Sequence, residues 1–113
     1  DEPCEIETAH GRVLAMPYSV ELNDIPMMLL QAHASSEWLQ RGIDQFERLY
    51  AEGEESARVM AISVHPYVTG VPHRIGYLEK LYEHIRQRPG VLMWKGEEIL
   101  DWYTDARRAA PAR

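Results

Sequence analysis

The amino-acid sequence predicts an α/β fold in which elements alternate as strand, helix, strand, helix, strand, helix. Short and nearly continuous apolar runs occur at residues 12–18, 58–64 and 91–94. Between and after them lie segments whose apolar residues recur every three or four positions, with glycine or proline at several junctions. This order is typical of parallel βα units, in which each crossover helix covers the sheet.

The first half of the chain contains one expected strand and one expected helix. Residues 12–18 are apolar without alternation, which favours a strand covered on both faces. A helix is expected over residues 36–53, with Ser36 as the N-cap and Gly53 as the C-cap. Its apolar positions fall on one face and are Trp38, Leu39, Ile43, Phe46, Leu49 and Tyr50.

The second half repeats this pattern twice. The run at 58–64 predicts a buried second strand, because it is too short for a typical helix. A second amphipathic helix is expected from Pro72 until just before Pro89, since proline is tolerated in a first helical turn. Residues 91–94 then predict a third strand and residues 96–106 a closing helix.

The whole chain, residues 1–113, is interpreted as the C-terminal part of a larger domain, with a polar leader over 1–10 and a frayed tail over 107–113. Three strands are few for a parallel sheet with both faces covered. The chain also begins at Asp1 rather than at methionine. We therefore expect an N-terminal half outside this sequence.

Composition excludes several classes of partner. A formal charge of -6 opposes binding to a phosphate backbone, so nucleic acid is not expected. No apolar stretch approaches the ~20 residues that cross a bilayer, so no membrane partner is expected. Cys4 is the only cysteine, which rules out an internal disulfide or a cysteine-based zinc finger and fits a cytoplasmic protein.

Candidate site residues follow the first two expected strands. Tyr18, Glu21, Asn23 and Asp24 come after the first strand, and His65 comes directly after the second. Loops at the carboxyl ends of parallel strands share one edge of the sheet, so these side chains are expected to face the same site. His65 would be partly desolvated there, which suits general acid-base chemistry near neutral pH.

Each of these residues also has a structural interpretation. His65 could simply hydrogen-bond a neighbouring carbonyl group. Asn23 and Asp24 could cap a short helix that begins near Ile25, and local sequence favours capping over substrate contact. An isolated glutamate such as Glu21 is usually solvated. Trp94 could line the site or belong to the core.

The remaining histidines do not form a ligand set, because they are scattered along the chain. Metal sites in proteins usually need three or four convergent ligands. We therefore expect this chain alone to bind no metal.

Four segments resemble the NodB-type polysaccharide deacetylases, in the branch that includes allantoinases and cyclic imide hydrolases. These segments are Leu14–Asp24, Ile43–Phe46 with Leu49 and Tyr50, Ile62–Pro66, and Gly96–Ile99. The resemblance implies the C-terminal portion of a deformed seven-stranded (β/α) barrel. It also implies that the N-terminal half supplies an Asp and a His-x-x-x-His pair for a divalent metal such as zinc, and neither motif occurs here.

The implied reaction is hydrolysis of a carbon–nitrogen bond that is not a peptide bond. The substrate would be an N-acetylated sugar or, as an alternative, the small cyclic amide of an allantoinase or imide hydrolase. His65 would protonate the departing nitrogen, with Tyr18, Glu21, Asn23, Asp24 and Trp94 near the substrate. We expect the chain alone to be inactive. A different alternative is a non-catalytic module that forms a homo-oligomer through open sheet edges.

Overall fold

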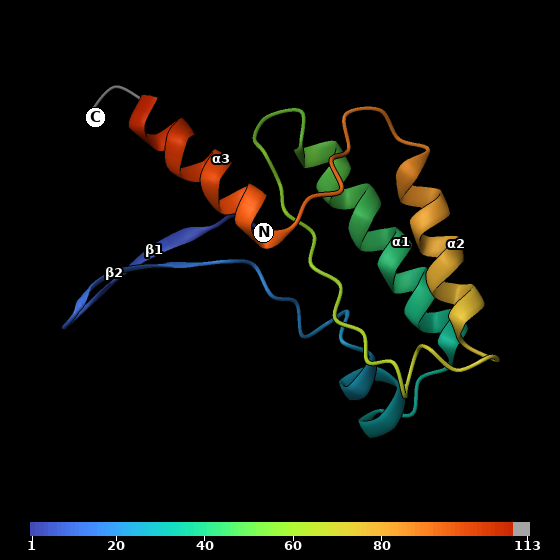
Figure 1. Cartoon of the computed structure of the whole chain (residues 1–113). Helices are drawn as coiled ribbons and strands as arrows, with labels where there is room; N and C mark the ends of the chain where they lie inside the picture. Colours follow the sequence, from blue (N-terminus) through green and yellow to red (C-terminus); the bar gives the residue numbers. More distant parts are fainter. Residues whose placement is uncertain (110–113) are drawn as a thin grey trace.

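The computed structural model describes the backbone of residues 1–109 and the side chains of residues 1–107. A β-hairpin comes first, a short π-helix and two packed helices follow, and a third helix closes the chain (Figure 1). The elements are β1 (Cys4–Thr8), β2 (Gly11–Ala15), η1 (Ile25–Leu30), α1 (Ser35–Glu52), α2 (Ile75–Arg86) and α3 (Gly96–Ala109).

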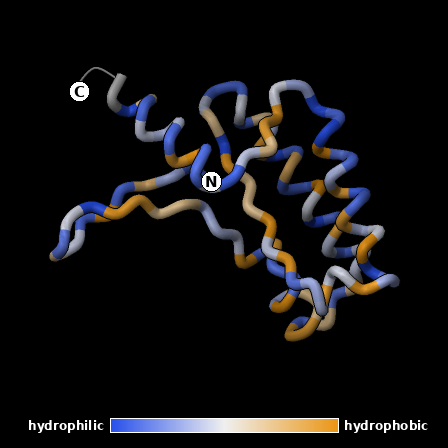
Figure 2. The backbone as a smooth tube through the Cα atoms, viewed as in Figure 1, coloured by the Kyte–Doolittle hydropathy of each residue, from blue (hydrophilic) through white to orange (hydrophobic). Residues whose placement is uncertain are grey.

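The core lies between α1, α2 and η1. Hydrophobic and hydrophilic positions alternate along both helices, so each has one apolar side to bury (Figure 2). Trp38 and Leu81 are completely buried where α1 and α2 pack together. The buried cluster consists of Met27, Met28, Trp38, Phe46, Val68, Leu81 and Ile85.

The three long helices confirm the periodicity in the sequence. α1 begins one residue before the expected Ser36 and ends at Glu52, with Gly53 as its C-cap. Its N-cap is Ala34 rather than Ser36, and the Glu37 carboxylate accepts a hydrogen bond of 2.7 Å from the Ala34 N–H. α2 begins three residues after Pro72, because the residues before Ile75 form turns. α3 includes the whole expected segment 96–106.

The first expected strand is present but shorter than predicted, and it pairs with a strand inside the leader that was not predicted. Residues 4–8 of the leader form β1, which pairs antiparallel with β2 and places Ile6 opposite Val13. The expected strand at 12–18 therefore ends at Ala15, and Val13 is half exposed rather than covered on both faces. Gly11 closes the hairpin with φ of +114°, a conformation that glycine adopts without strain.

The other two predicted strands are extended but do not belong to a sheet in the described residues. Segment 58–64 makes one parallel bridge, between Asn23 and Ser63, and residues 91–94 make none. An apolar run forms a strand only where a neighbouring strand supplies hydrogen-bond partners. The fold therefore has mixed helix and strand content, and a continuous parallel sheet is not present within residues 1–109.

The C-terminal helix stands apart from the α1–α2 pair and runs close to the hairpin (Figure 1). Arg107 on α3 lies 3.7 Å from the Glu5 carboxylate on β1. The expected frayed tail overlaps the last turns of α3, and residues 110–113 lie outside the described part. None of the helices up to Ala109 has the length and apolar character needed to cross a membrane.

The molecule is flat, with principal extents of 50 × 37 × 19 Å. Its radius of gyration is 16.2 Å, whereas a compact domain of this length would have one of about 13 Å. Several large apolar side chains remain exposed, among them Leu92, Met93 and Trp102. The α1–α2 layer thus buries one side of the extended segments and leaves much of the other side open.

Two helical glycines provide a test of the packing between α1 and α2. A Cβ atom at Gly42 would lie 2.8 Å from Leu81 Cδ2, whereas one at Gly76 would meet nothing within 4 Å. Both alanine variants gain roughly 0.5–1 kcal/mol of helix propensity. Gly42→Ala additionally overpacks the core, at a cost of about 1–3 kcal/mol. We expect Gly42→Ala to be less stable than Gly76→Ala in urea unfolding, and equal stability would contradict this packing.

Candidate functional site

The structure brings Asp24 and His65 together, although 41 positions separate them in the sequence. Asp24 Oδ1 lies 2.7 Å from Nδ1 of the His65 imidazole. The second carboxylate oxygen, Oδ2, accepts a hydrogen bond of 2.7 Å from the backbone N–H of His65. The carboxylate therefore contacts both the ring and the backbone of the same histidine.

Backbone contacts place the two residues opposite each other. The Asp24 N–H donates to the Ser63 carbonyl at 3.1 Å, within the parallel bridge that joins the two chain segments. Leu22, two residues earlier, is completely buried, and its carbonyl accepts a hydrogen bond of 3.4 Å from the Trp38 indole. The position of Asp24 is thus fixed from α1 on one side and from segment 58–64 on the other.

A tight turn after His65 supplies a third partner. The His65 carbonyl accepts hydrogen bonds from the N–H groups of Val68 and Thr69, both at 2.9 Å. The Thr69 hydroxyl donates to Asp24 Oδ2 at 2.6 Å. Thr69 was not among the predicted site residues. A threonine after an apolar run carries no signal of this role, and only the fold of the turn directs it to Asp24.

Asp24 is completely buried but remains ionised at neutral pH. Burial alone would raise the pKa of its carboxyl group. The hydrogen bonds from the Thr69 hydroxyl and from the backbone and ring of His65 outweigh burial, and they hold the pKa below its ordinary value. A buried carboxylate with three donors is therefore available to hold a histidine ring.

The contact with Asp24 also determines which nitrogen of the His65 imidazole carries the proton. An ionised carboxylate only accepts hydrogen bonds, so the hydrogen-bond network assigns a proton to Nδ1. Nε2 is then the ring nitrogen available for proton transfer. The His65 side chain is about one third exposed, and the exposed Tyr67 ring lies 5.6 Å from it, centroid to centroid. This arrangement can perform general acid-base chemistry.

Asn23 and Asp24 do not act together as a helix cap. The Asn23 Oδ1 atom accepts a hydrogen bond of 3.1 Å from the Ile25 N–H at the start of η1. Asp24 occupies the N-cap position but makes no capping hydrogen bond with its side chain. The capping interpretation therefore holds for Asn23, while both Asp24 oxygens are used by residues 65–69.

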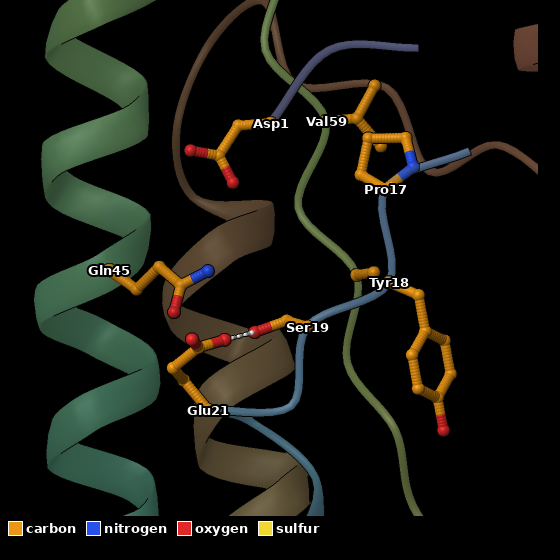
Figure 3. Close-up of a pocket in the computed structure, with 8 residues that line it drawn as sticks. Asp1, Pro17, Tyr18, Ser19, Glu21, Gln45 and Val59 are labelled. Atoms are coloured by element: carbon orange, nitrogen blue, oxygen red, sulfur yellow. Dashed lines mark hydrogen bonds between the residues drawn. The ribbon is translucent and has the colours of Figure 1, made fainter. Parts of the chain in front are cut away.

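Tyr18 and Glu21 line a different cavity, of about 430 Å³, whose lining does not include His65 (Figure 3). The Ser19 hydroxyl donates to Glu21 at 3.0 Å, and the Tyr18 ring points away from that carboxylate. A hydrogen bond from the Glu21 backbone, followed by that of Ser19, lowers the pKa of Glu21. Asn23 links to Tyr18 by a hydrogen bond of 3.2 Å. Substrate contact by these residues stays a prediction.

Trp94 is not brought to this cluster. It lines an apolar groove of about 810 Å³ with Leu49 and Gly53 at the C-terminal end of α1. Asp24 directly precedes η1, and the nearby Leu22 carbonyl accepts a hydrogen bond from Trp38, which lies in the N-terminal part of α1, at the opposite end of that helix from Gly53. The expectation that Trp94 borders the same site as His65 depended on a third parallel strand, which residues 91–94 do not form.

The described residues do not offer a metal site. Within residues 1–109, no three His, Cys, Asp or Glu side chains converge in a way that could hold an ion. Near His65, the Asp24 carboxylate is buried with both oxygens taken. The chemistry of these donors therefore does not fit a divalent metal bound by this chain alone.

The low pKa of Asp24 predicts how stability depends on pH. The unfolded state, with an ordinary value of 3.8, binds more protons in acid than the folded state does. The stabilisation by the ionised carboxylate is thus fully present above 3.8 and is lost as pH falls through the lower folded pKa. Asp24→Asn should cost about 1–3 kcal/mol at neutral pH.

Urea unfolding measured from neutral pH into acid checks this prediction. The difference between the wild type and Asp24→Asn should shrink in acid, because only the wild type has this carboxylate to protonate. Asp101→Asn, at an exposed position on α3, serves as the matched control and should change stability little. A difference for Asp24→Asn that stays constant across the acid range would contradict the assignment.

Comparisons with known proteins give a consistent family name. No protein-family model matches the chain. A protein from Schizosaccharomyces pombe, named as a candidate polysaccharide deacetylase, is 36% identical over 89 residues, which is 77% of this chain and 28% of that protein. The crystal structure of a probable polysaccharide deacetylase from Pseudomonas aeruginosa PAO1 matches the whole chain with a TM-score of 0.84 at 25% identity.

The chain spans well under half of each relative, since it covers 38% of the solved structure. Both relatives carry the same family name, and the structural match extends over every residue of this chain. The chain is thus similar, over most or all of its length, to parts of two proteins that are named as polysaccharide deacetylases.

Proposed function

We propose that this chain carries the proton-donating histidine of a hydrolase that removes the acetyl group from an N-acetylated sugar. The observation that supports the proposal most is the Asp24–His65 contact of 2.7 Å, which leaves Nε2 of a partly exposed imidazole available. The family name of both relatives supplies the reaction class. Neither observation alone would specify a deacetylase.

The proposed step begins after water has added to the acetyl carbonyl carbon. The carbon–nitrogen bond breaks, and the bonding electrons remain on nitrogen. The His65 Nε2 atom has by then taken up the proton that was released when water added, so the ring is doubly protonated. It transfers this proton to the departing nitrogen, the sugar amine leaves in neutral form, and acetic acid, which ionises to acetate, is the second product. Asp24 accepts the Nδ1–H hydrogen bond throughout and stabilises the ring while it is positively charged.

The group that activates the water is proposed to lie outside this chain. The sequence resemblance implies a divalent metal such as zinc, which would polarise the carbonyl group. Because the described residues do not fit a metal, other parts of a longer protein would have to hold it. The step assigned to His65 requires only residues of this chain.

We also propose that the extended segments are strands of a barrel completed by other residues. Segment 58–64 is apolar on both sides: Met60 and Ile62 pack on the core, while Val59 and Ala61 line the cavity beside Tyr18. Such two-sided apolarity suits a strand in the middle of a covered sheet. The flat shape and the 38% coverage of the solved relative agree with this arrangement.

The same site would also serve the alternative substrates. An allantoinase or cyclic imide hydrolase opens a ring amide, and the departing nitrogen again needs a proton. The Asp24–His65 geometry suits both reactions equally, so the family name of the relatives is what favours the acetylated sugar. Assays of one longer protein with chito-oligosaccharide and with allantoin separate the two.

A second candidate function is self-association of this chain as a module. The apolar groove beside Trp94 and the exposed side chains of Leu92, Met93 and Trp102 favour it. Open strand edges and apolar patches promote association between copies.

Replacing His65 in the longer, active protein tests the proposed role. His65→Gln should lower kcat by about 10²–10⁴-fold, because the departing amine loses its proton donor. His73→Gln, an exposed histidine beyond the same turn, is the matched control and should retain activity. Deacetylation of chito-oligosaccharide is followed by acetate release.

The 113-residue chain is assayed alongside. It should release no acetate, because the group that activates water is proposed to lie elsewhere. Acetate release by the short chain, or full activity of His65→Gln in the longer protein, would contradict the proposal.

Sedimentation tests the second candidate function. At tens of micromolar, a self-associating chain should form dimers, and Met93→Glu should weaken them by placing a charge in the apolar patch. Leu30→Glu changes an exposed residue of η1 away from the groove and serves as the control. A monomer throughout this range would rule out self-association as the function.

A further inference from the structure

We propose that Thr69 is a positioning residue, whose hydroxyl orients the Asp24 carboxylate so that Oδ1 faces Nδ1 of His65. The role in catalysis depends on the proposed function of His65. The orientation itself is a property of this chain and can be measured without any activity.

The two carboxylate oxygens have different partners. Oδ2 accepts from the Thr69 hydroxyl at 2.6 Å and from the His65 backbone N–H at 2.7 Å, while Oδ1 faces only the imidazole. Rotation about χ2 of an aspartate has broad, shallow minima, so the torsion alone does not fix the plane of the carboxylate. Two donors on one oxygen define that plane and leave the other oxygen for the ring.

Burial strengthens the hydrogen bonds that the Asp24 carboxylate accepts. Asp24 is 0% exposed and Thr69 is 1% exposed, so water cannot replace either partner easily. A hydrogen bond to an ionised group is stronger than one between neutral groups, and a low local dielectric strengthens it further. Removal of the hydroxyl would therefore leave a buried charge with two donors in place of three.

The turn fixes where the hydroxyl lies. The Thr69 N–H donates to the His65 carbonyl at 2.9 Å, and the next residue packs closely against the start of the turn. A Cβ atom at Gly70 would overlap the Pro66 carbonyl oxygen. Val68, which directly precedes Thr69, is buried in the core and anchors the turn there. The backbone of the turn thus positions the Thr69 hydroxyl against Asp24, and this position does not depend on the His65 imidazole ring.

The consequence for His65 is a preference between ring tautomers. A fixed Oδ1 stabilises the neutral form that carries its proton on Nδ1. A carboxylate free to turn would hold this tautomer less well, and more of the ring would carry its proton on Nε2. Thr69 therefore acts on Nε2 through Asp24, without touching a substrate.

The test compares Thr69→Val, which keeps the shape of the side chain but removes the hydroxyl, with Thr69→Ser, which keeps the hydroxyl. Long-range proton–nitrogen correlation spectra of the 113-residue chain give the ratio of the two neutral tautomers of His65. Thr69→Val should lower the ratio of Nδ1–H to Nε2–H roughly tenfold, as expected for loss of one hydrogen bond to a charged group. Thr69→Ser should keep the wild-type ratio.

A wild-type ratio in folded Thr69→Val would overturn the proposal, and so would a loss in Thr69→Ser as large as that in Thr69→Val. Amide spectra report whether each variant is folded. If Thr69→Val does not fold, Thr69→Ala is compared with Thr69→Ser in the same way, with the same outcomes.

A parallel assay of the longer protein separates this proposal from the proposed function. Thr69→Val should lower kcat about tenfold with little change in KM, and Thr69→Ser should restore it. A shifted tautomer ratio with no deacetylase activity in any variant would refute the function and leave the positioning role intact. An unshifted ratio beside an active enzyme would refute the positioning role alone.

Discussion

A single buried carboxylate links the two halves of the described structure. Asp24 belongs to the segment that enters η1, and its partners His65 and Thr69 belong to the turn that leads towards α2. An ionised group without water must be satisfied by donors, and here three donors surround two oxygens. The hydrogen bonds that stabilise the buried Asp24 carboxylate also orient the His65 imidazole. Stability and the candidate chemistry thus depend on one set of contacts.

The core supports this cluster from one side only. α1 and α2 bury Trp38, Phe46 and Leu81, and the extended segments lie against this layer. The opposite side carries exposed apolar groups and backbone edges with few hydrogen-bond partners in residues 1–109. All of this chain matches the solved relative, but it corresponds to only 38% of that relative. An exposed apolar side is expected if residues outside this chain cover it in a longer protein. In self-association, a second copy of this chain would cover the same surface.

Sequence reasoning predicted the helices well because their signal is local. The three- and four-residue spacing in α1 and α2 indicates the buried face without knowledge of any partner. The strands at 58–64 and 91–94 were not predictable in this sense, since a strand exists only beside a neighbour. The hairpin of β1 and β2 was missed because exposed residues such as Glu5 and Glu7 alternate with few apolar ones.

The site was predicted in part, for similar reasons. The place of His65 after an apolar run predicts acid-base chemistry, and that role stays a prediction. The structure adds the Asp24 contact, which position alone could not name. Asp24 was expected to cap a helix or contact substrate because its local sequence suits both, yet its partners lie more than 40 residues away. Thr69 had no local signal at all, and Trp94 was placed by a strand that does not form.

The most direct measurement of the central claim is a double-mutant cycle between Asp24 and His65. Urea unfolding of the wild type, Asp24→Ala, His65→Ala and the double variant gives the coupling energy between the carboxylate and the imidazole ring. Groups in direct contact are expected to couple by roughly 0.5–3 kcal/mol. A coupling of about 1 kcal/mol or more at neutral pH is the predicted result. Effects that add within about 0.3 kcal/mol would contradict the contact on which this account is based.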